Sequence, residues 1–123
     1  SDVNDNGNLD INTISKVFNK RVKAIILVHL NGLPCDLDPI MKFAKKHKLY
    51  VIEDCSQAHG AKYKGRPVGS FGDVSIWSFC QDKIISTGGE GGMISTNKKK
   101  NMETMLVVQG TWKKLPKLFF QKA

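Results

Sequence analysis

The sequence predicts an α/β domain built around a mainly parallel β-sheet. Two apolar runs rich in β-branched residues, KAIILVH (23–29) and LYVIED (49–54), are typical of buried strands. The segment between them has apolar residues at helical spacing, so the three segments form a strand–helix–strand unit. Parallel strands joined in this way are covered on both faces, and ligands bind beyond their carboxyl ends. We therefore expect both runs to be buried on both faces, with the acids Glu53 and Asp54 pointing to where ligand chemistry occurs.

A short helix is expected before the first strand, after a polar and turn-rich opening segment. Either Asp10 or Asn12 is a candidate N-cap for it. Its apolar residues recur at helical spacing, and they are Ile11, Ile14, Val17 and Phe18.

The crossover helix is expected over about 39–47, where it covers one face of the sheet. Asp36 or Asp38 can cap this helix, and Pro39 suits its first position because proline there loses no helical hydrogen bond.

Beyond this unit, residues 63–67 predict a hairpin or a loop, and two more apolar runs predict strands. We expect at least three parallel strands, near 24–29, 50–54 and 74–79, and a further strand over 92–96. The segment QDKIISTGGEGG before this last strand is too rich in glycine near its end for regular structure.

Length, charge and cysteine content narrow the classes of function. The 123 residues suit one domain, and the net charge of +8 is concentrated after residue 97, where seven lysines and one acid carry +6. The remaining +2 does not favour nucleic-acid binding, which needs a basic recognition face. The three cysteines fit neither a disulfide framework nor a zinc site. This cysteine content leads us to expect a protein of the reducing cytoplasm with no metal. Since no membrane-spanning run or signal peptide is present, we expect no membrane partner.

Lys83 is the most informative single residue. It follows a predicted buried strand and precedes the glycine-rich stretch 88–92. A lysine in such a place can have a partly desolvated amine, as Schiff-base chemistry requires. Taken alone, however, an ordinary surface lysine in a loop is the more common interpretation.

Asp54 is the second candidate, because a carboxylate at the end of a buried strand needs a cation, hydrogen-bond donors or a metal. A pyridinium nitrogen would suit it, and a helix cap or salt bridge is equally open. Gln57 and His59 follow closely, and the hydroxyl of Ser78, five residues before Lys83, can bind phosphate. Each of these residue types is common in structural roles, and the chain has neither a Walker A pattern nor GxGxxG after a strand.

The order and separation of these candidates resemble a known family. The blocks EDCSQAHGAKYKGRPVGSFGD (53–73) and SFCQDKIISTGGEGG (78–92) are similar to the core motifs of the DegT/DnrJ/EryC1/StrS sugar aminotransferases. The similarity covers about residues 20–97 of this single partial domain, and 105–123 form a divergent basic tail. It implies a fragment of the mainly parallel three-layer α/β/α large domain of a fold-type I enzyme that uses pyridoxal 5′-phosphate. It also implies that the strand over 92–96 runs antiparallel, as in the family core.

The resemblance also implies a role for each candidate at that cofactor. Asp54 would pair with the pyridine nitrogen, Gln57 would contact the phenolic oxygen, and Ser78 would bind the 5′-phosphate. Lys83 would hold the cofactor through a Schiff base and move protons during transamination, with Asp54 as the second catalytic residue. His59 would have a supporting role in cofactor binding. A related branch of the family carries out deoxygenation with a histidine at the position of Lys83, so this lysine argues against that branch.

The activity implied by the resemblance is amino transfer to a nucleotide-linked keto-sugar. Glutamate is the expected donor, surface polysaccharide is the expected destination, and a homodimer is the expected assembly because family sites are completed by a second subunit. Since family members are considerably longer, the chain is expected to be a core fragment. A catalytically silent relic or interaction module that keeps the fold is the alternative, and nucleic-acid binding through the basic tail is a third hypothesis.

Two geometric expectations follow. Asp54 and the Lys83 amine should lie on the order of 5–8 Å apart across one pocket, with Ser78 on its phosphate side. Apolar surface should drive self-association, with contributions from Leu115, Leu118, Phe119 and Phe120.

Overall fold

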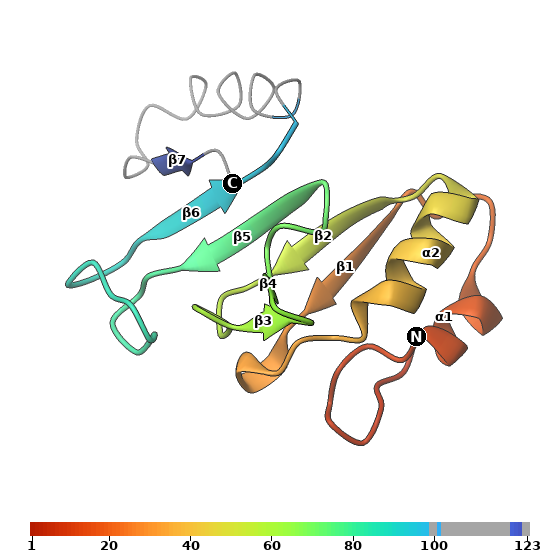
Figure 1. Ribbon diagram of the computed structural model, residues 1–123, viewed down its shortest axis with the longest axis horizontal. Helices are drawn as coiled ribbons and strands as arrows, with labels where there is room; N and C mark the ends of the chain where they lie inside the picture. The colour runs from red at the N-terminus through yellow and green to blue at the C-terminus, as the bar shows by residue number, and fades with distance from the viewer. Residues whose placement is uncertain (99–100, 102–118, 122–123) are drawn as a thin grey trace.

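The computed structural model describes residues 1–98, 101 and 119–121 (Figure 1). Within them, one sheet has the strand order β1 (Ala24–Val28), β2 (Tyr50–Asp54), β5 (Val74–Ser78), β6 (Gly92–Ser95) and β7 (Phe119–Gln121). Strands β1, β2 and β5 are mutually parallel, β6 is antiparallel to β5, and β7 is parallel to β6. The predicted set of three parallel strands and one antiparallel strand is confirmed. The positions of Leu115 and Leu118 lie outside the described residues.

The two predicted helices are present, with one change at the start of the second. Helix α1 (Ile11–Val17) is capped by Asp10, whose side chain accepts a hydrogen bond from the backbone N–H of Asn12. Helix α2 (Leu37–His47) begins two residues earlier than the sequence predicts, so Pro39 is its third residue rather than its first. Residue 36 occupies the N-cap position but makes no side-chain cap.

Asp36 does not cap α2 because its carboxylate has another partner. Its Oδ1 accepts a hydrogen bond from the Tyr63 hydroxyl at 2.5 Å. Tyr63 belongs to a hairpin of β3 (Lys62–Tyr63) and β4 (Arg66–Pro67), which confirms the hairpin alternative for this segment. The turn residues Lys64 and Gly65 have φ of 49° and 81°, the left-handed pair that a two-residue hairpin turn requires.

The hydrophobic core lies on one face of the sheet, which we call the covered face. Helices α1 and α2 pack there, beside β1 in Figure 1, and α2 turns three buried side chains toward the sheet. The larger cluster of buried apolar residues consists of Ile14, Ile25, Leu27, Cys35, Leu37, Ile40, Ala44 and Val51, and a smaller one of Cys55, Ala58 and Val68.

The opposite face, which we call the open face, is not covered by any described helix. Side chains alternate between the two faces along a strand, so β1 shows the pattern exposed–buried–exposed–buried–exposed. Ile26 and Tyr50 on this face are 62% and 61% exposed, and Val28 is 40% exposed. The prediction that both runs are buried on both faces is therefore wrong for the described residues, because both helices pack on the covered face.

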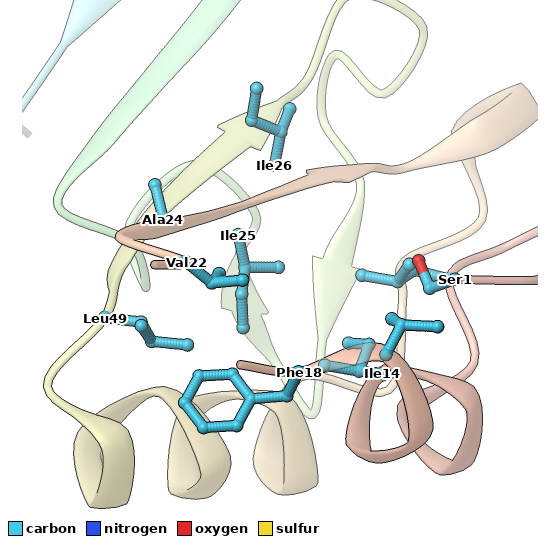
Figure 2. Close-up of a pocket in the computed structure, with 10 residues that line it drawn as sticks. Ser1, Ile14, Phe18, Val22, Ala24, Ile25, Ile26 and Leu49 are labelled. Atoms are coloured by element: carbon cyan, nitrogen blue, oxygen red, sulfur yellow. The ribbon is translucent and has the colours of Figure 1, made fainter. Parts of the chain in front are cut away.

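A mostly apolar cavity of about 180 Å³ lies at the amino ends of β1 and β2, between them and α1 (Figure 2). Phe18 and Ile14 reach into it from the helix, and Val22, Ala24 and Leu49 line it from the strand starts. It contains none of the predicted site residues.

No helix among the described residues has the length and apolar character needed to cross a membrane.

Candidate functional site

A second cavity, of about 400 Å³, lies beyond the carboxyl ends of the parallel strands. Three chain segments line it: the connection after β1, the turn after β2, and the long connection between β5 and β6. Ligands bind at this edge of parallel α/β sheets. The lining residues are Asn31, Ser56, Gln57, Asp82, Lys83 and Ile84. Two of the five predicted site residues, Gln57 and Lys83, therefore share one pocket.

Lys83 is positioned by the connection between the antiparallel strands β5 and β6. This connection is closed at its base, since the Phe79 backbone N–H donates to the Gly91 carbonyl at 2.8 Å and Thr87 N–H donates to the Phe79 carbonyl at 3.0 Å. The Lys83 side chain is only 22% exposed, and its Nζ lies 3.9 Å from the carboxylate of Asp82. A partly buried lysine at the pocket wall is the arrangement that amine chemistry requires.

The carboxylate of Asp82 has a second neighbour, the thiol of Cys80, which donates to its Oδ1 at 2.6 Å. This hydrogen bond and the nearby Lys83 ammonium lower the pKa of Asp82. The carboxylate thus stays ionised beside the lysine. Sequence reasoning did not identify Asp82, and its position next to Lys83 was the available signal.

The Gln57 side chain has a defined orientation. Its Oε1 accepts a hydrogen bond from the backbone N–H of Asn31 at 2.9 Å. Because a backbone N–H needs an acceptor, this contact assigns the oxygen of the carboxamide to Asn31 and leaves its NH₂ group to donate elsewhere. Gln57 is exposed at the pocket, so this donor is accessible to a ligand.

Asp54 and Ser78 lie at the carboxyl ends of neighbouring strands, on the open face. Asp54 pairs in register with Ile76, so it shares a face with the alternate residue Ser78. The Asp54 carboxylate accepts the Ser56 N–H at 3.0 Å, and the Ser78 hydroxyl accepts the Cys80 N–H at 3.5 Å. Neither residue lines the pocket that contains Lys83, and the expected separation of Asp54 and Lys83 stays a prediction.

His59 lies on a different side from Asp54 and Ser78. Its ring packs against Trp77 and Phe79, with centroid distances of 5.4 and 5.6 Å. Both ring nitrogens are buried and have no hydrogen-bond partner among the described residues. His59 does not line the pocket with Lys83, and its supporting role in cofactor binding stays a prediction.

Glu53, next to Asp54, makes buried hydrogen bonds that were not predicted from the sequence. It is fully buried on the covered face, where its Oε1 accepts the N–H groups of Phe71 and Gly72 at 2.7 and 2.5 Å. Its Oε2 accepts the Gly69 N–H at 2.7 Å and lies 3.2 Å from His29 Nε2. The expectation that Glu53 points toward ligand chemistry is wrong, because consecutive strand residues point to opposite faces.

These contacts also determine the charge of Glu53. Burial alone would raise the pKa of its carboxyl group, but the hydrogen bonds from His29 and from three backbone N–H groups outweigh burial and lower it. His29 Nδ1 accepts the Cys35 N–H at 3.1 Å, so the ring proton is on Nε2 and is donated to Glu53. We infer a neutral imidazole paired with an ionised carboxylate.

One group of potential metal ligands exists among the described residues. The ligand atoms of His29, Glu53 and Cys55 lie within 4.8 Å of one another, all buried. Hydrogen bonds within the protein already occupy both nitrogens of His29 and both oxygens of Glu53. This cluster is therefore a hydrogen-bonded structural unit, and it offers a metal no accessible lone pair from these two residues.

Comparisons with known proteins give a consistent result. The family model described as the DegT/DnrJ/EryC1/StrS aminotransferase family matches residues 1–116. GDP-perosamine synthase of Escherichia coli O157:H7 is 45% identical over 107 residues, which are 87% of this chain and 29% of that protein. The chain thus spans less than a third of the length of this curated relative.

Solved structures match equally well. An aminotransferase from Psychrobacter cryohalolentis has a TM-score of 0.84 and 56% identity, over 86% of this chain and 27% of that one. An E. coli GDP-4-keto-6-deoxy-D-mannose-3-dehydratase, solved with bound hydrated PLP, has a TM-score of 0.80 and 26% identity over 94% of this chain and 30% of that one. The neighbours are fold-type I enzymes that depend on pyridoxal phosphate, so the predicted fold class and the cofactor of the family are confirmed.

Proposed function

Because the chain belongs to the DegT/DnrJ/EryC1/StrS aminotransferase family, we propose that it forms the cofactor-binding core of a nucleotide-sugar aminotransferase. The observation that carries this proposal is the common pocket of Lys83 and Gln57, which combines a partly buried amine with an oriented amide donor. The name of the related GDP-perosamine synthase supports a nucleotide-linked sugar as substrate.

The residues present fit pyridoxal 5′-phosphate. The pocket of about 400 Å³ has the size of a small-molecule site. The Gln57 NH₂ group, whose orientation is set by Asn31, suits an anionic phenolic oxygen. Asp54 accepts one hydrogen bond from Ser56, which leaves carboxylate lone pairs for a protonated pyridine nitrogen. Ser78 offers a hydroxyl for the phosphate. His59, which packs against Trp77 and Phe79, is expected to support this arrangement.

When bound, the cofactor would act as the electron sink for cleavage of a C–H bond. Lys83 would form the covalent attachment through Nζ. Once the amino donor has displaced it, the same amine would take a proton from the α-carbon of the donor and return it to the carbon of the cofactor's former aldehyde group. Asp54 would keep the pyridine nitrogen protonated, which strengthens the electron sink. Asp82 would hold the Lys83 ammonium near the pocket wall before attachment.

The partners of the reaction are proposed on the same basis. Glutamate is the proposed amino donor, surface polysaccharide is the proposed destination of the amino sugar, and the cytoplasm is the proposed location of the protein. A homodimer is proposed because the open face exposes Ile26, Val28 and Tyr50, and contiguous apolar surface of this kind commonly marks an interface.

The test is covalent trapping of the cofactor on the purified protein. Pyridoxal phosphate is added, and the near-ultraviolet and visible absorbance is recorded. Reduction with borohydride followed by peptide mass spectrometry then locates the attachment. We expect attachment at Lys83, loss of it in Lys83→Ala, and no change in the matched control Lys64→Ala, an exposed lysine paired with Asp38. Asp54→Asn should retain the attachment but slow exchange of the donor's α-proton.

The alternative function is a catalytically silent module that keeps the fold for interaction. It predicts that the native protein is folded but does not attach the cofactor at Lys83. That result would reject the aminotransferase proposal for this chain while leaving its family membership unchanged.

A further inference from the structure

The connection between β1 and α2 reaches the pocket through a single tight turn. Its 3₁₀ helix η1 (Leu30–Gly32) contains Asn31, whose backbone is left-handed with φ of 52° and ψ of 28°. This conformation directs the Asn31 N–H toward Gln57 Oε1. The orientation of the Gln57 carboxamide therefore depends on where this turn is held.

His29 closes the turn from inside the protein. Its backbone N–H donates to the Asp54 carbonyl at 3.1 Å, which continues the β1–β2 ladder to the start of the turn. Its ring Nδ1 accepts the Cys35 N–H at 3.1 Å, which fixes the other end of the turn. The ring itself is held by Glu53, whose carboxylate also accepts three N–H groups of the 69–72 loop.

Asn8 holds the same turn from the opposite side. It is 2% exposed, its Oδ1 accepts the Leu30 N–H at 3.1 Å, and its Nδ2 donates to the Leu33 carbonyl at 3.0 Å. Both ends of η1 are thus fixed by side chains that never touch the pocket. Neither residue was identified from the sequence.

We infer that the buried pair Glu53–His29, together with Asn8, positions the Asn31 N–H so that the Gln57 carboxamide presents its NH₂ group, and not its oxygen, to the pocket. Without a fixed Asn31 N–H, the carboxamide can rotate by half a turn, and its oxygen would then face an anionic ligand group. This inference rests on the proposed role of Gln57 at the phenolic oxygen. His29, Glu53 and Asn8 are positioning residues.

The first measurement needs no cofactor. The temperature coefficient of the Asn31 amide proton, measured by NMR on the purified protein, reports its hydrogen bond to Gln57. His29→Asn keeps an acceptor near the place of Nδ1 but loses the donor to Glu53, and Asn8→Ala removes the second brace without touching Glu53. Both should weaken the Asn31 hydrogen bond, whereas Ile40→Ala, a destabilising control in the buried face of α2, should leave it unchanged.

The second measurement uses the protein loaded with pyridoxal phosphate and follows the pH midpoint of its absorbance change. A donor at the phenolic oxygen favours the ionised form, so Gln57→Ala should move the midpoint to higher pH by roughly one unit. His29→Asn and Asn8→Ala should move it in the same direction, by no more than Gln57→Ala, and should add nothing when combined with it.

The inference is overturned if the Asn31 amide behaves as in the native protein in both variants, or if Ile40→Ala shifts the midpoint as much as they do. Additive shifts on top of Gln57→Ala would also contradict it. Absence of any cofactor absorbance in the native protein would instead reject the proposed function, and the amide measurement would still decide the positioning of Gln57.

Discussion

The covered and open faces of the sheet carry neighbouring carboxylates in opposite surroundings. On the covered face, Glu53 is fully buried and accepts hydrogen bonds from His29 and three backbone N–H groups. On the open face, Asp54 is half-buried and, among the described residues, accepts one from the Ser56 N–H. A carboxylate with every lone pair in use can only stabilise the fold, whereas one with spare acceptor capacity can bind a ligand.

The largest expected effect comes from removing each carboxylate in turn. Glu53→Ala leaves the His29 Nε2–H and three backbone N–H groups without their acceptor, so we expect a loss of about 3–5 kcal/mol in the free energy of unfolding. Asp54→Ala should cost less than about 1 kcal/mol, because its side chain supports only a local turn. Urea unfolding followed by circular dichroism measures both. Equal losses would show that the two faces do not differ as described.

A comparison of two glycines tests how closely the 69–72 loop packs. Gly69 has φ of 80°, and a Cβ there would collide with the Trp77 ring, so Gly69→Ala should destabilise by about 2–3 kcal/mol. Gly65 has nearly the same φ, 81°, but no atom within 4 Å of a Cβ. Gly65→Ala should therefore cost only the backbone strain, about 1 kcal/mol. Thermal unfolding of the two variants separates strain from collision, and a Gly69→Ala protein as stable as Gly65→Ala would contradict the close packing.

A charge on the open face tests whether that face is an interface. Ile26→Lys should weaken self-association about tenfold, or about 1.4 kcal/mol. The Ile26 side chain is 62% exposed in the single chain, and the proposed interface would have to desolvate a lysine in its place. Sedimentation velocity over a concentration series measures this effect. Val3→Lys is the matched control, since Val3 is 56% exposed outside the sheet. A native protein that stays monomeric, or equal effects of both variants, would exclude the open face as the interface.

The smallest effect is expected from acid, because a protonated Glu53 can still accept hydrogen bonds through its carbonyl oxygen. Its pKa is lowered in the folded protein, so its contribution to stability is complete above the unfolded value near 4.5 and is lost as pH falls through the folded value. The difference in unfolding free energy between the native protein and Glu53→Gln should therefore shrink on going from pH 6 to pH 3. A difference that stays constant over this range would mean that Glu53 does not titrate with folding.

The sequence was sufficient to predict the strand–helix–strand unit and the position of the fourth strand, because these depend on local apolar periodicity and turn residues. The antiparallel direction of the fourth strand was predicted from the family resemblance. It was insufficient for the open face. The side chains of Ile26, Val28 and Tyr50 are equally compatible with a strand buried on both faces and with one buried on a single face, because their burial depends on what packs above them. The start of α2 was missed for a similar reason, since Asp36 bonds to Tyr63, 27 residues away in the chain.

The sequence pointed to some residues of the candidate pocket, and the roles of these residues at the cofactor stay predictions. Lys83 and Gln57 were identified by residue type and motif, and the fold brings them to one pocket. Glu53 was misassigned because two adjacent acids at a strand end suggest chemistry for both, although strand alternation already separates them. Asn8 gave no local signal at all, since its partners Leu30 and Leu33 are more than 20 residues away.

The distribution of thiols has a practical consequence. Cys35 and Cys55 are fully buried, and burial raises the pKa of both, so neither forms a thiolate readily. Cys80 is partly exposed and lies on the same connection as Lys83. A thiol-specific fluorophore or spin label should therefore attach first at Cys80, three residues from the proposed attachment point. The native chain thus offers a built-in reporter position from which ligand arrival can be followed without an engineered cysteine.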